Sequence, residues 1–326
     1  MTVTPTALLY RPYFKFARLS FLQESHLYHS PDFREFVLEQ LQEGGPFEVM
    51  ALAALNCMVL VPISQVKTKY AITVGYPLSI AVTTTLLITR IVNAELIDGQ
   101  YHWFAPSTLL ALATICYGVR LAGYVWIRDL MGWKPGRTYG KSKFLNMSRL
   151  KRVPVSMILA CCYACLMTPV LYALRHPIKP ADGYLRRAAV WGGVLVAWIS
   201  VVLQAVSDGH KHACKRAAAL QRCTDEILFV GPDSGLYGFV RHPNYLFELL
   251  FWTSTFFTGT QSMEWSLGAW IPSILGLLFI IAIMLDASRR LEICQKQKYA
   301  GQPRYEAWKR SVPYPVLPGV GAKVRR

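Results

Sequence analysis

Charged side chains are scarce in this chain. Aspartate, glutamate, lysine and arginine together make up 17% of its 326 residues, against 53% for the hydrophobic residues. Ordinary soluble domains carry about a quarter charged residues. The apolar residues are also grouped in long runs and do not follow a helical or strand period, which is typical of membrane spans. The composition therefore argues against a soluble globular domain.

Acidic residues are scarcer than basic ones, 19 against 35, which gives a formal net charge of +16. Such basicity can indicate nucleic-acid binding. Here, however, lysine and arginine fall between the apolar runs, as they do in the cytoplasmic loops of membrane proteins. Zinc-finger spacing, aromatic patterns of RNA-binding domains and a recognition helix are all missing from the sequence. We therefore expect a lipid bilayer, and no nucleic acid, as the partner.

Clusters of metal-binding residues and nucleotide-binding loops are missing as well. The chain has eight cysteines and seven histidines, and most of the cysteines lie inside apolar runs, where cysteine behaves as a small hydrophobic residue. Cys161, Cys162 and Cys165 lack a second Cys or His pair nearby that would complete a metal site. A Gly-x-Gly-x-x-Gly motif in the context of a Rossmann fold and a Walker loop are also absent. We expect no metal and no Rossmann domain.

Seven apolar runs have about the length that a bilayer requires. The sequence therefore predicts an all-α polytopic integral membrane protein with about seven transmembrane helices, in a single membrane domain over 46–326. Residues 1–45 contain no span and are predicted to be an interfacial or disordered leader. Their basic residues, which precede the first acid, also resemble a targeting segment. The seven runs cover 47–64, 71–92, 104–126, 154–174, 188–207, 244–261 and 267–286.

The distribution of basic residues between the runs predicts the orientation. Lysine and arginine are frequent in 128–152, in 208–243 and after 286, and are missing from 93–103 and 262–266. The positive-inside rule therefore places the three basic segments and the C-terminus on the cytoplasmic side. The segment 175–187 is an exception, because it carries four basic residues and would face the other way.

The most informative stretch precedes the sixth run. Pro243 suits the first position of a helix, where a missing N–H group costs nothing. The free N–H groups of that first turn, together with Arg241 and His242 just outside it, form a positively charged end that suits a phosphate. The alternative is a membrane-interface anchor, in which Arg241 and His242 contact lipid headgroups.

Polar residues continue into the predicted span itself. Asn244 and Glu248 are four residues apart and share one helix face, with Tyr245 beside them. A carboxylate that enters a bilayer is expensive and usually indicates an internal polar site. Arg120, inside the third run, needs a partner or a water-filled cavity unless it extends to the nearby boundary. Asp208 lies where the fifth run gives way to a basic loop; one Asp208–His212 pair is too few ligands for a metal site.

Four stretches resemble the steroid 5α-reductase superfamily, including its DUF1295 branch, over about 104–318. Sterol C14/Δ7 reductases are similar, and isoprenylcysteine methyltransferases share Gly-x-Tyr-x-x-x-Arg-His-Pro-x-Tyr. Gln204 and His210 depart from the DUF1295 pattern, in which an acid and a glutamine stand at these positions. The four stretches are Arg-His-Pro-Asn-Tyr at 241–245 with the acid at 248, Arg-Leu-x-x-Tyr-x-x-x-Arg at 120–128, Asp-x-x-Lys at 208–211, and the acid–Arg, Tyr and Tyr-x-x-Trp series over 286–308.

The resemblance implies an NADPH-dependent oxidoreductase acting on an activated C=C bond (a CH–CH group) of a hydrophobic lipid, steroid-like or enoyl/acyl. The membrane would be that of the endoplasmic reticulum in a eukaryote, or of an organelle. The cofactor pocket would be formed by the C-terminal helices and cytoplasmic loops. The implied cofactor-binding residues are Arg120, Arg128, Asp208, Arg241, His242, Asn244, Tyr245, Glu248, Arg289, Arg290 and Tyr299.

The catalytic group of 5α-reductases belongs to the N-terminal half, which carries no matching motif here. Tyr70, Tyr76 and Glu95 are the candidates that this half offers. Two alternatives stay open. One is an S-adenosylmethionine-dependent methyltransferase of the isoprenylcysteine type, and the other is a sterol-binding homologue without catalysis, which the departures at Gln204 and His210 allow.

Overall fold

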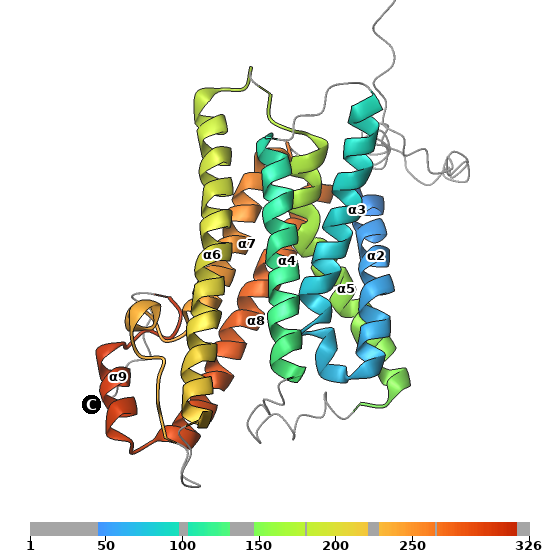
Figure 1. Cartoon of the computed structure of the whole chain (residues 1–326). Helices are drawn as coiled ribbons and strands as arrows, with labels where there is room; N and C mark the ends of the chain where they lie inside the picture. Colours follow the sequence, from blue (N-terminus) through green and yellow to red (C-terminus); the bar gives the residue numbers. More distant parts are fainter. Residues whose placement is uncertain are drawn as a thin grey trace, which may run out of the picture.

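The computed structural model describes residues 45–97, 104–130, 147–179, 181–220, 228–264 and 266–317. Within these ranges all regular elements are helical, which confirms the predicted fold class (Figure 1). The predicted leader, apart from Gly45, lies outside the described residues. The elements are α2 (Gly45–Val66), η2 (Thr68–Ala71), α3 (Gly75–Ile97), α4 (Pro106–Leu130), α5 (Arg149–Arg175), α6 (Tyr184–Leu220), η4 (Gly235–Gly238), α7 (Pro243–Thr260), α8 (Leu267–Tyr299) and α9 (Pro303–Ser311).

Six of the described helices, α2 to α6 and α8, are long and apolar enough to cross a membrane. The chain is therefore a multi-pass membrane protein. The seventh predicted span forms helix α7, with Pro243 at its first position as expected, but α7 is not among the six. Asn244, Glu248, one serine and four threonines lower its hydropathy, and it packs against α5, α6 and α8 inside the bundle.

Helices α6 and α8 are longer than a bilayer requires. They contain 37 and 33 residues, or about 55 and 50 Å at 1.5 Å per residue, whereas the hydrocarbon core is about 30 Å thick. Their C-terminal ends therefore extend beyond the bundle, where α9 lies beside them (Figure 1). A second hydrophobic cluster forms there from Phe229, Tyr237, Tyr305, Trp308 and Val312.

The antiparallel arrangement of the helices sorts the connecting segments onto two ends of the bundle (Figure 1). One end, which we call the basic end, contains η2, the C-termini of α4, α6 and α8, the N-termini of α5 and α7, and α9. It thus contains the described parts of the three basic segments. The segments that precede α4, α6 and α8 lie at the opposite end. Two sets of loops are therefore separated as predicted, while the cytoplasmic location of the basic end stays a prediction.

Close contact between α3 and α4 gives a test of the packing. A Cβ added at Gly118 in α4 would lie 2.5 Å from the Pro77 carbonyl oxygen and 2.8 Å from the Ala81 Cβ. Small residues allow membrane helices to approach in this way, and the backbone of α3 cannot move aside cheaply. We expect Gly118→Ala to reduce the free energy of unfolding by about 1–3 kcal/mol.

Gly123 provides the control on the same helix. A Cβ added there meets nothing within 4 Å, so Gly123→Ala should leave stability unchanged or raise it by up to about 1 kcal/mol through helix propensity. Thermal unfolding of both variants in the same detergent is the measurement. Equal melting temperatures for the two variants would contradict the close α3–α4 packing.

Candidate functional site

A buried carboxylate lies at the centre of the polar interior. Glu248 of α7 is 5% exposed. Its Oε1 accepts hydrogen bonds from the hydroxyl of Tyr117 in α4 at 2.8 Å and the hydroxyl of Tyr76 in α3 at 3.3 Å. Its Oε2 accepts one from Nε2 of Gln204 in α6 at 3.3 Å. Four helices thus contribute to one site, as expected for a charge that must find donors inside a membrane protein.

The hydroxyl oxygen of Tyr76 has two further neighbours: the Trp252 indole donates to it, and the Tyr117 hydroxyl can direct its single hydrogen either to it or to Glu248. The Trp252 indole N–H is 2.8 Å away, and the Tyr117 hydroxyl is 2.9 Å away. Aromatic rings surround these polar atoms. Phe251 stacks on Tyr117 at 4.5 Å between ring centroids, and Tyr163 lies 4.8 Å from Tyr76. The phenol hydroxyls are therefore held in fixed positions by donors and acceptors within apolar packing.

The network continues from Gln204 toward the basic end. The Gln204 side-chain oxygen accepts a hydrogen bond from Arg120 of α4. Arg120 also forms an ion pair with Asp208 of α6, with Nη1 and Oδ2 2.8 Å apart, and Asp208 is only 5% exposed. Arg120 therefore has an internal partner. Gln204, which departs from the family pattern, is the side chain that links Glu248 to this ion pair.

Two buried atoms at the edge of this network have no hydrogen-bond partner among the described residues. They are the Asn244 side-chain oxygen Oδ1, in the first turn of α7, and the Arg120 Nε. The main-chain oxygen of Asn244 accepts a hydrogen bond from Gln204 at 3.3 Å, so this turn lies directly beside the network. Buried polar groups are usually paired. An acceptor and a donor are thus available here to a polar ligand.

Positively charged side chains gather beyond Asp208. Lys211 on α6 interacts electrostatically with Asp208 and with Arg128 of α4. Lys215, one turn further on, is within electrostatic range of Lys211, Arg128 and Lys298 of α8. Arg128 also lies over the Tyr124 ring, 5.6 Å from its centroid. Like charges repel at such distances, so this cluster, Arg128, Lys211, Lys215 and Lys298, suits an anion with more than one negative charge.

Arg241 and His242 have a different environment. Arg241 is 4% exposed, and its Nε and Nη2 each donate to Glu292 of α8 at 2.9 Å, while Nη1 donates to the Val312 carbonyl at 2.7 Å. The His242 Nε2 is 2.8 Å from Glu292 Oε1. Burial lowers the pKa of His242, although Glu292 opposes this effect. These contacts attach the loop before α7 to α8 and to the C-terminal segment.

The remaining predicted site residues of α8 lie on or near its surface. Asp286 and Arg290 form the expected i,i+4 ion pair at 2.7 Å, with both side chains more than half exposed. Arg289 is exposed. Arg289 and Glu292 are three residues apart, a spacing that predicts a local ion pair, but Glu292 binds Arg241 and His242 instead.

Tyr299 and Tyr245, two further residues predicted to bind the cofactor, make aromatic contacts. The Tyr299 ring lies 5.3 Å from that of Phe229 in the cluster beside α9. The Tyr245 ring lies 5.8 Å from the His242 ring. Tyr245 therefore borders the buried network, whereas Tyr299 belongs to the part that extends beyond the bundle.

The three candidate catalytic residues lie in different places. Tyr76 is part of the Glu248 network. Tyr70 lies at the basic end, where its hydroxyl and the side chains of Lys67 and Lys69 bind Asp129. Glu95 lies in the last turns of α3, at the opposite end of the bundle. The structure therefore brings only Tyr76 of these three to the Glu248 network.

Several members of the network were missed from the sequence. Tyr117 precedes Arg120 by three residues, and Trp252 follows Glu248 by four, so each shares a helix face with a residue that was predicted. This spacing was the available signal. In the described part of the chain, no three His, Cys, Asp or Glu side chains lie close enough to hold a metal ion.

Six membrane-crossing helices that enclose a carboxylate–tyrosine network, with a basic cluster at one end, define a polytopic membrane protein with an internal polar site. Residues 63–312 match the model of a family described as "Protein of unknown function (DUF1295)", which is the steroid 5α-reductase-like family domain, and the chain belongs to this family. It is therefore a membrane-associated, steroid-reductase-like protein. The match begins well before residue 104 and includes the whole network. Neither the curated proteins nor the solved structures contain a match.

Proposed function

We propose that this protein is a membrane-embedded, NADPH-dependent reductase of an activated C=C bond in a hydrophobic lipid, steroid-like or enoyl. One observation carries the proposal. A continuous polar network leads from the phenols of Tyr76 and Tyr117, inside the bundle, through Gln204 to Arg120 and the basic cluster. It places proton donors at one end and cations at the other, with apolar packing around the donors.

The residues at the edge of the network fit a nicotinamide dinucleotide. A carboxamide both donates and accepts hydrogen bonds, and the unpartnered Asn244 Oδ1 and Arg120 Nε offer an acceptor and a donor. Lys211, Lys215 and Arg128 would hold the phosphates. Bound NADPH supplies a hydride to the substrate.

The chain's own side chains would handle the proton. Tyr76 is positioned to donate its phenolic proton to the substrate, because Trp252 and Tyr117 both lie within donor distance of its oxygen and can stabilise the charge left there. Glu248 fixes the two tyrosines and Gln204, since both of its oxygens already accept hydrogen bonds. The aromatic surroundings exclude water, which strengthens these electrostatic interactions.

The other predicted cofactor residues take supporting roles in this proposal. Arg241 and His242 hold the loop that begins α7, and so set the position of Asn244. Tyr245 borders the site. Arg289, Arg290 and Tyr299, on the part of α8 that extends beyond the bundle, would contact the distal portion of the dinucleotide.

Thermal stability of the purified protein tests the cofactor. We expect NADPH to raise the melting temperature, because a ligand at a hundred times its dissociation constant adds about 2.7 kcal/mol. Lys211→Met should abolish most of this shift without lowering the melting temperature of the ligand-free protein, because it removes one of several clustered like charges. Arg310→Gln, which changes an exposed residue of α9, is the matched control and should keep the shift.

Other outcomes identify the alternatives. Stabilisation by S-adenosylmethionine and not by NADPH would show that the protein is a methyltransferase of the isoprenylcysteine type and not a reductase. Stabilisation by neither cofactor would leave the non-catalytic sterol-binding homologue.

A further inference from the structure

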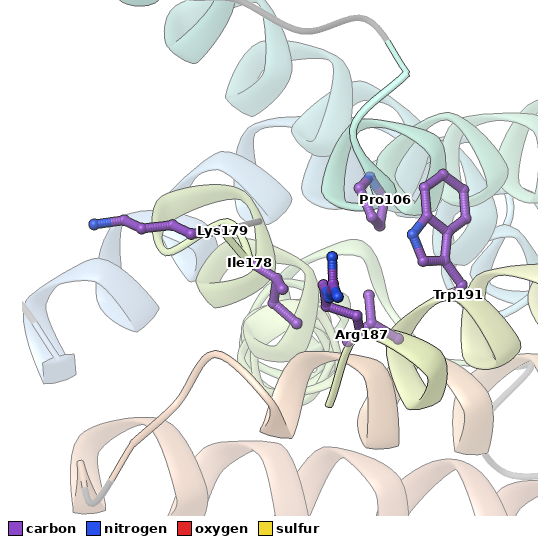
Figure 2. Close-up of a pocket in the computed structure, with 6 residues that line it drawn as sticks. Pro106, Ile178, Lys179, Arg187 and Trp191 are labelled. Atoms are coloured by element: carbon purple, nitrogen blue, oxygen red, sulfur yellow. The ribbon is translucent and has the colours of Figure 1, made fainter. Parts of the chain in front are cut away.

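A hollow of about 210 Å³ lies at the end of the bundle opposite to the basic end. It is formed where α4 and α6 begin and where the segment after α5 passes between them (Figure 2). It is separate from the Glu248 network, and the proposed function does not use it. Its lining residues are Pro106, Ile178, Lys179, Arg187, Val190 and Trp191.

One cation points into the hollow. The Arg187 guanidinium extends from α6 toward Pro106 and lies between Ile178 and Pro106 in this view (Figure 2). The stem of Lys179 lines the other side, with its ammonium group directed outward on a flexible chain (Figure 2). Among the described residues no acid forms an ion pair with Arg187 or Lys179. The lining is otherwise apolar, so the hollow combines an uncompensated guanidinium with a hydrophobic wall.

The other two arginines of the same segment are neutralised. Arg175 is paired with Glu48 of α2. Arg186 is paired with Asp182 at 3.2 Å and also donates from its Nε to the Gln261 carbonyl at 3.0 Å. These two arginines have partners within the protein. Arg187 and Lys179 are therefore the basic residues of the 175–187 segment that form no ion pair with a described residue.

The position of the hollow favours a lipid as its occupant. Trp191 is 47% exposed and Leu185 is 82% exposed, on the first turns of a helix that crosses the membrane. Tryptophan beside a cation is typical of the level where headgroups meet hydrocarbon. A second, adjoining hollow is lined by Tyr184, Arg187, Ala188 and Trp191, so the cation borders an outward-facing aromatic surface.

We propose that this hollow binds the phosphate of an anionic glycerophospholipid. Arg187 would bind the phosphate oxygens, which its planar guanidinium can contact in pairs, and Lys179 would add a second charge. Ile178, Val190 and Trp191 would contact the glycerol and the first methylenes of the acyl chains. The N-terminal dipoles of α4 and α6, which both begin here, add to the attraction. A bound lipid anion would compensate the basic segment that departs from the positive-inside pattern.

The experiment measures lipid retained by the full-length protein in native mass spectrometry from detergent. Dioleoyl-phosphatidylglycerol is the probe, and dioleoylglycerol, which lacks the phosphate, is its neutral counterpart. We expect wild type to retain phosphatidylglycerol and Arg187→Gln to retain at least fivefold less at the same lipid concentration, with Arg187→Lys between the two. Arg149→Gln is the matched control, because it removes an exposed arginine from the first turn of a spanning helix at the other end.

Three results would overturn the proposal. The first is equal retention of phosphatidylglycerol by wild type and Arg187→Gln. The second is equal retention of dioleoylglycerol and phosphatidylglycerol by wild type. The third is displacement of the lipid by an equimolar amount of glycerol 3-phosphate, which would identify the occupant as a soluble phosphate. These readouts are independent of NADPH and of catalysis.

Discussion

Glu292→Ala is expected to destabilise the protein by roughly 3–5 kcal/mol, the cost of removing one partner from a buried ion pair. Glu292 accepts two hydrogen bonds from Arg241, at 2.9 Å each, and faces the His242 Nε2 at 2.8 Å. Arg241 is 4% exposed and His242 is fully buried. Without the carboxylate, the guanidinium would remain desolvated and unpaired, and the loop that begins α7 would lose its attachment to α8.

Asp286 provides the control on the same helix. Its ion pair with Arg290 is similar in length at 2.7 Å, but its side chain is 55% exposed, so Asp286→Ala should cost about 0–1 kcal/mol. Denaturant titration in mixed micelles is the measurement. In a double-mutant cycle, Arg241→Leu combined with Glu292→Leu should cost less than the sum of the two single changes. A Glu292→Ala variant as stable as Asp286→Ala would show that the attachment is not needed.

The membrane spans could largely be predicted from the sequence, because the length of an apolar run is a local property. Six of the seven runs lie in helices long and apolar enough to cross a membrane. Helices α6 and α8, however, continue to Leu220 and Tyr299, well past the predicted ends at 207 and 286. The exception, α7, was placed correctly as a helix but is less apolar than a span requires. Its polar residues form hydrogen bonds inside the bundle, and the length of an apolar run does not predict such contacts.

The candidate site could be predicted only where spacing along one helix carried the information. Asn244 and Glu248 were expected on one face, and both border the network. Tyr76, Arg120 and Asp208 of other helices were also named as candidates, but which side chains they contact was not predictable. Arg241 was expected to be available to a phosphate, but its donors bind Glu292, which is 51 residues away along the chain. The spacing of Arg289 and Glu292 likewise predicts a local ion pair that does not form, because Glu292 binds the buried Arg241 and His242 and not the exposed Arg289.

The contacts of Gln204 give a physical reason for its departure from the family pattern. An acid at this position would face Glu248 and would place two carboxylates together in a buried site, where like charges are costly. The amide instead donates to Glu248 at 3.3 Å and accepts from Arg120. The neutral side chain therefore lets Glu248 accept from Gln204, Tyr117 and Tyr76 at once.

If the protein is the proposed reductase, Tyr76→Phe should reduce turnover by about 10²- to 10⁴-fold, the usual contribution of a positioned general acid. Tyr76 is the phenol whose oxygen lies within reach of both Trp252 and Tyr117, so donors are at hand for its conjugate base. Tyr117→Phe removes one of these donors and should reduce turnover by about tenfold. Both variants should bind NADPH with wild-type affinity, because neither hydroxyl contacts Asn244 or the basic cluster.

Tyr163 supplies the matched control. Its ring packs on Tyr76 at 4.8 Å and is just as buried, yet its hydroxyl makes no hydrogen bond to the Glu248 network. Tyr163→Phe should therefore keep wild-type turnover. The assay follows NADPH oxidation with a panel of 3-oxo-Δ4 steroids and trans-2-enoyl thioesters, and a run in D2O separates the solvent-exchangeable proton in the product from the hydride that NADPH supplies. Wild-type turnover in Tyr76→Phe, or an equal loss in Tyr163→Phe, would remove Tyr76 from the reaction, because only its hydroxyl distinguishes the two substitutions.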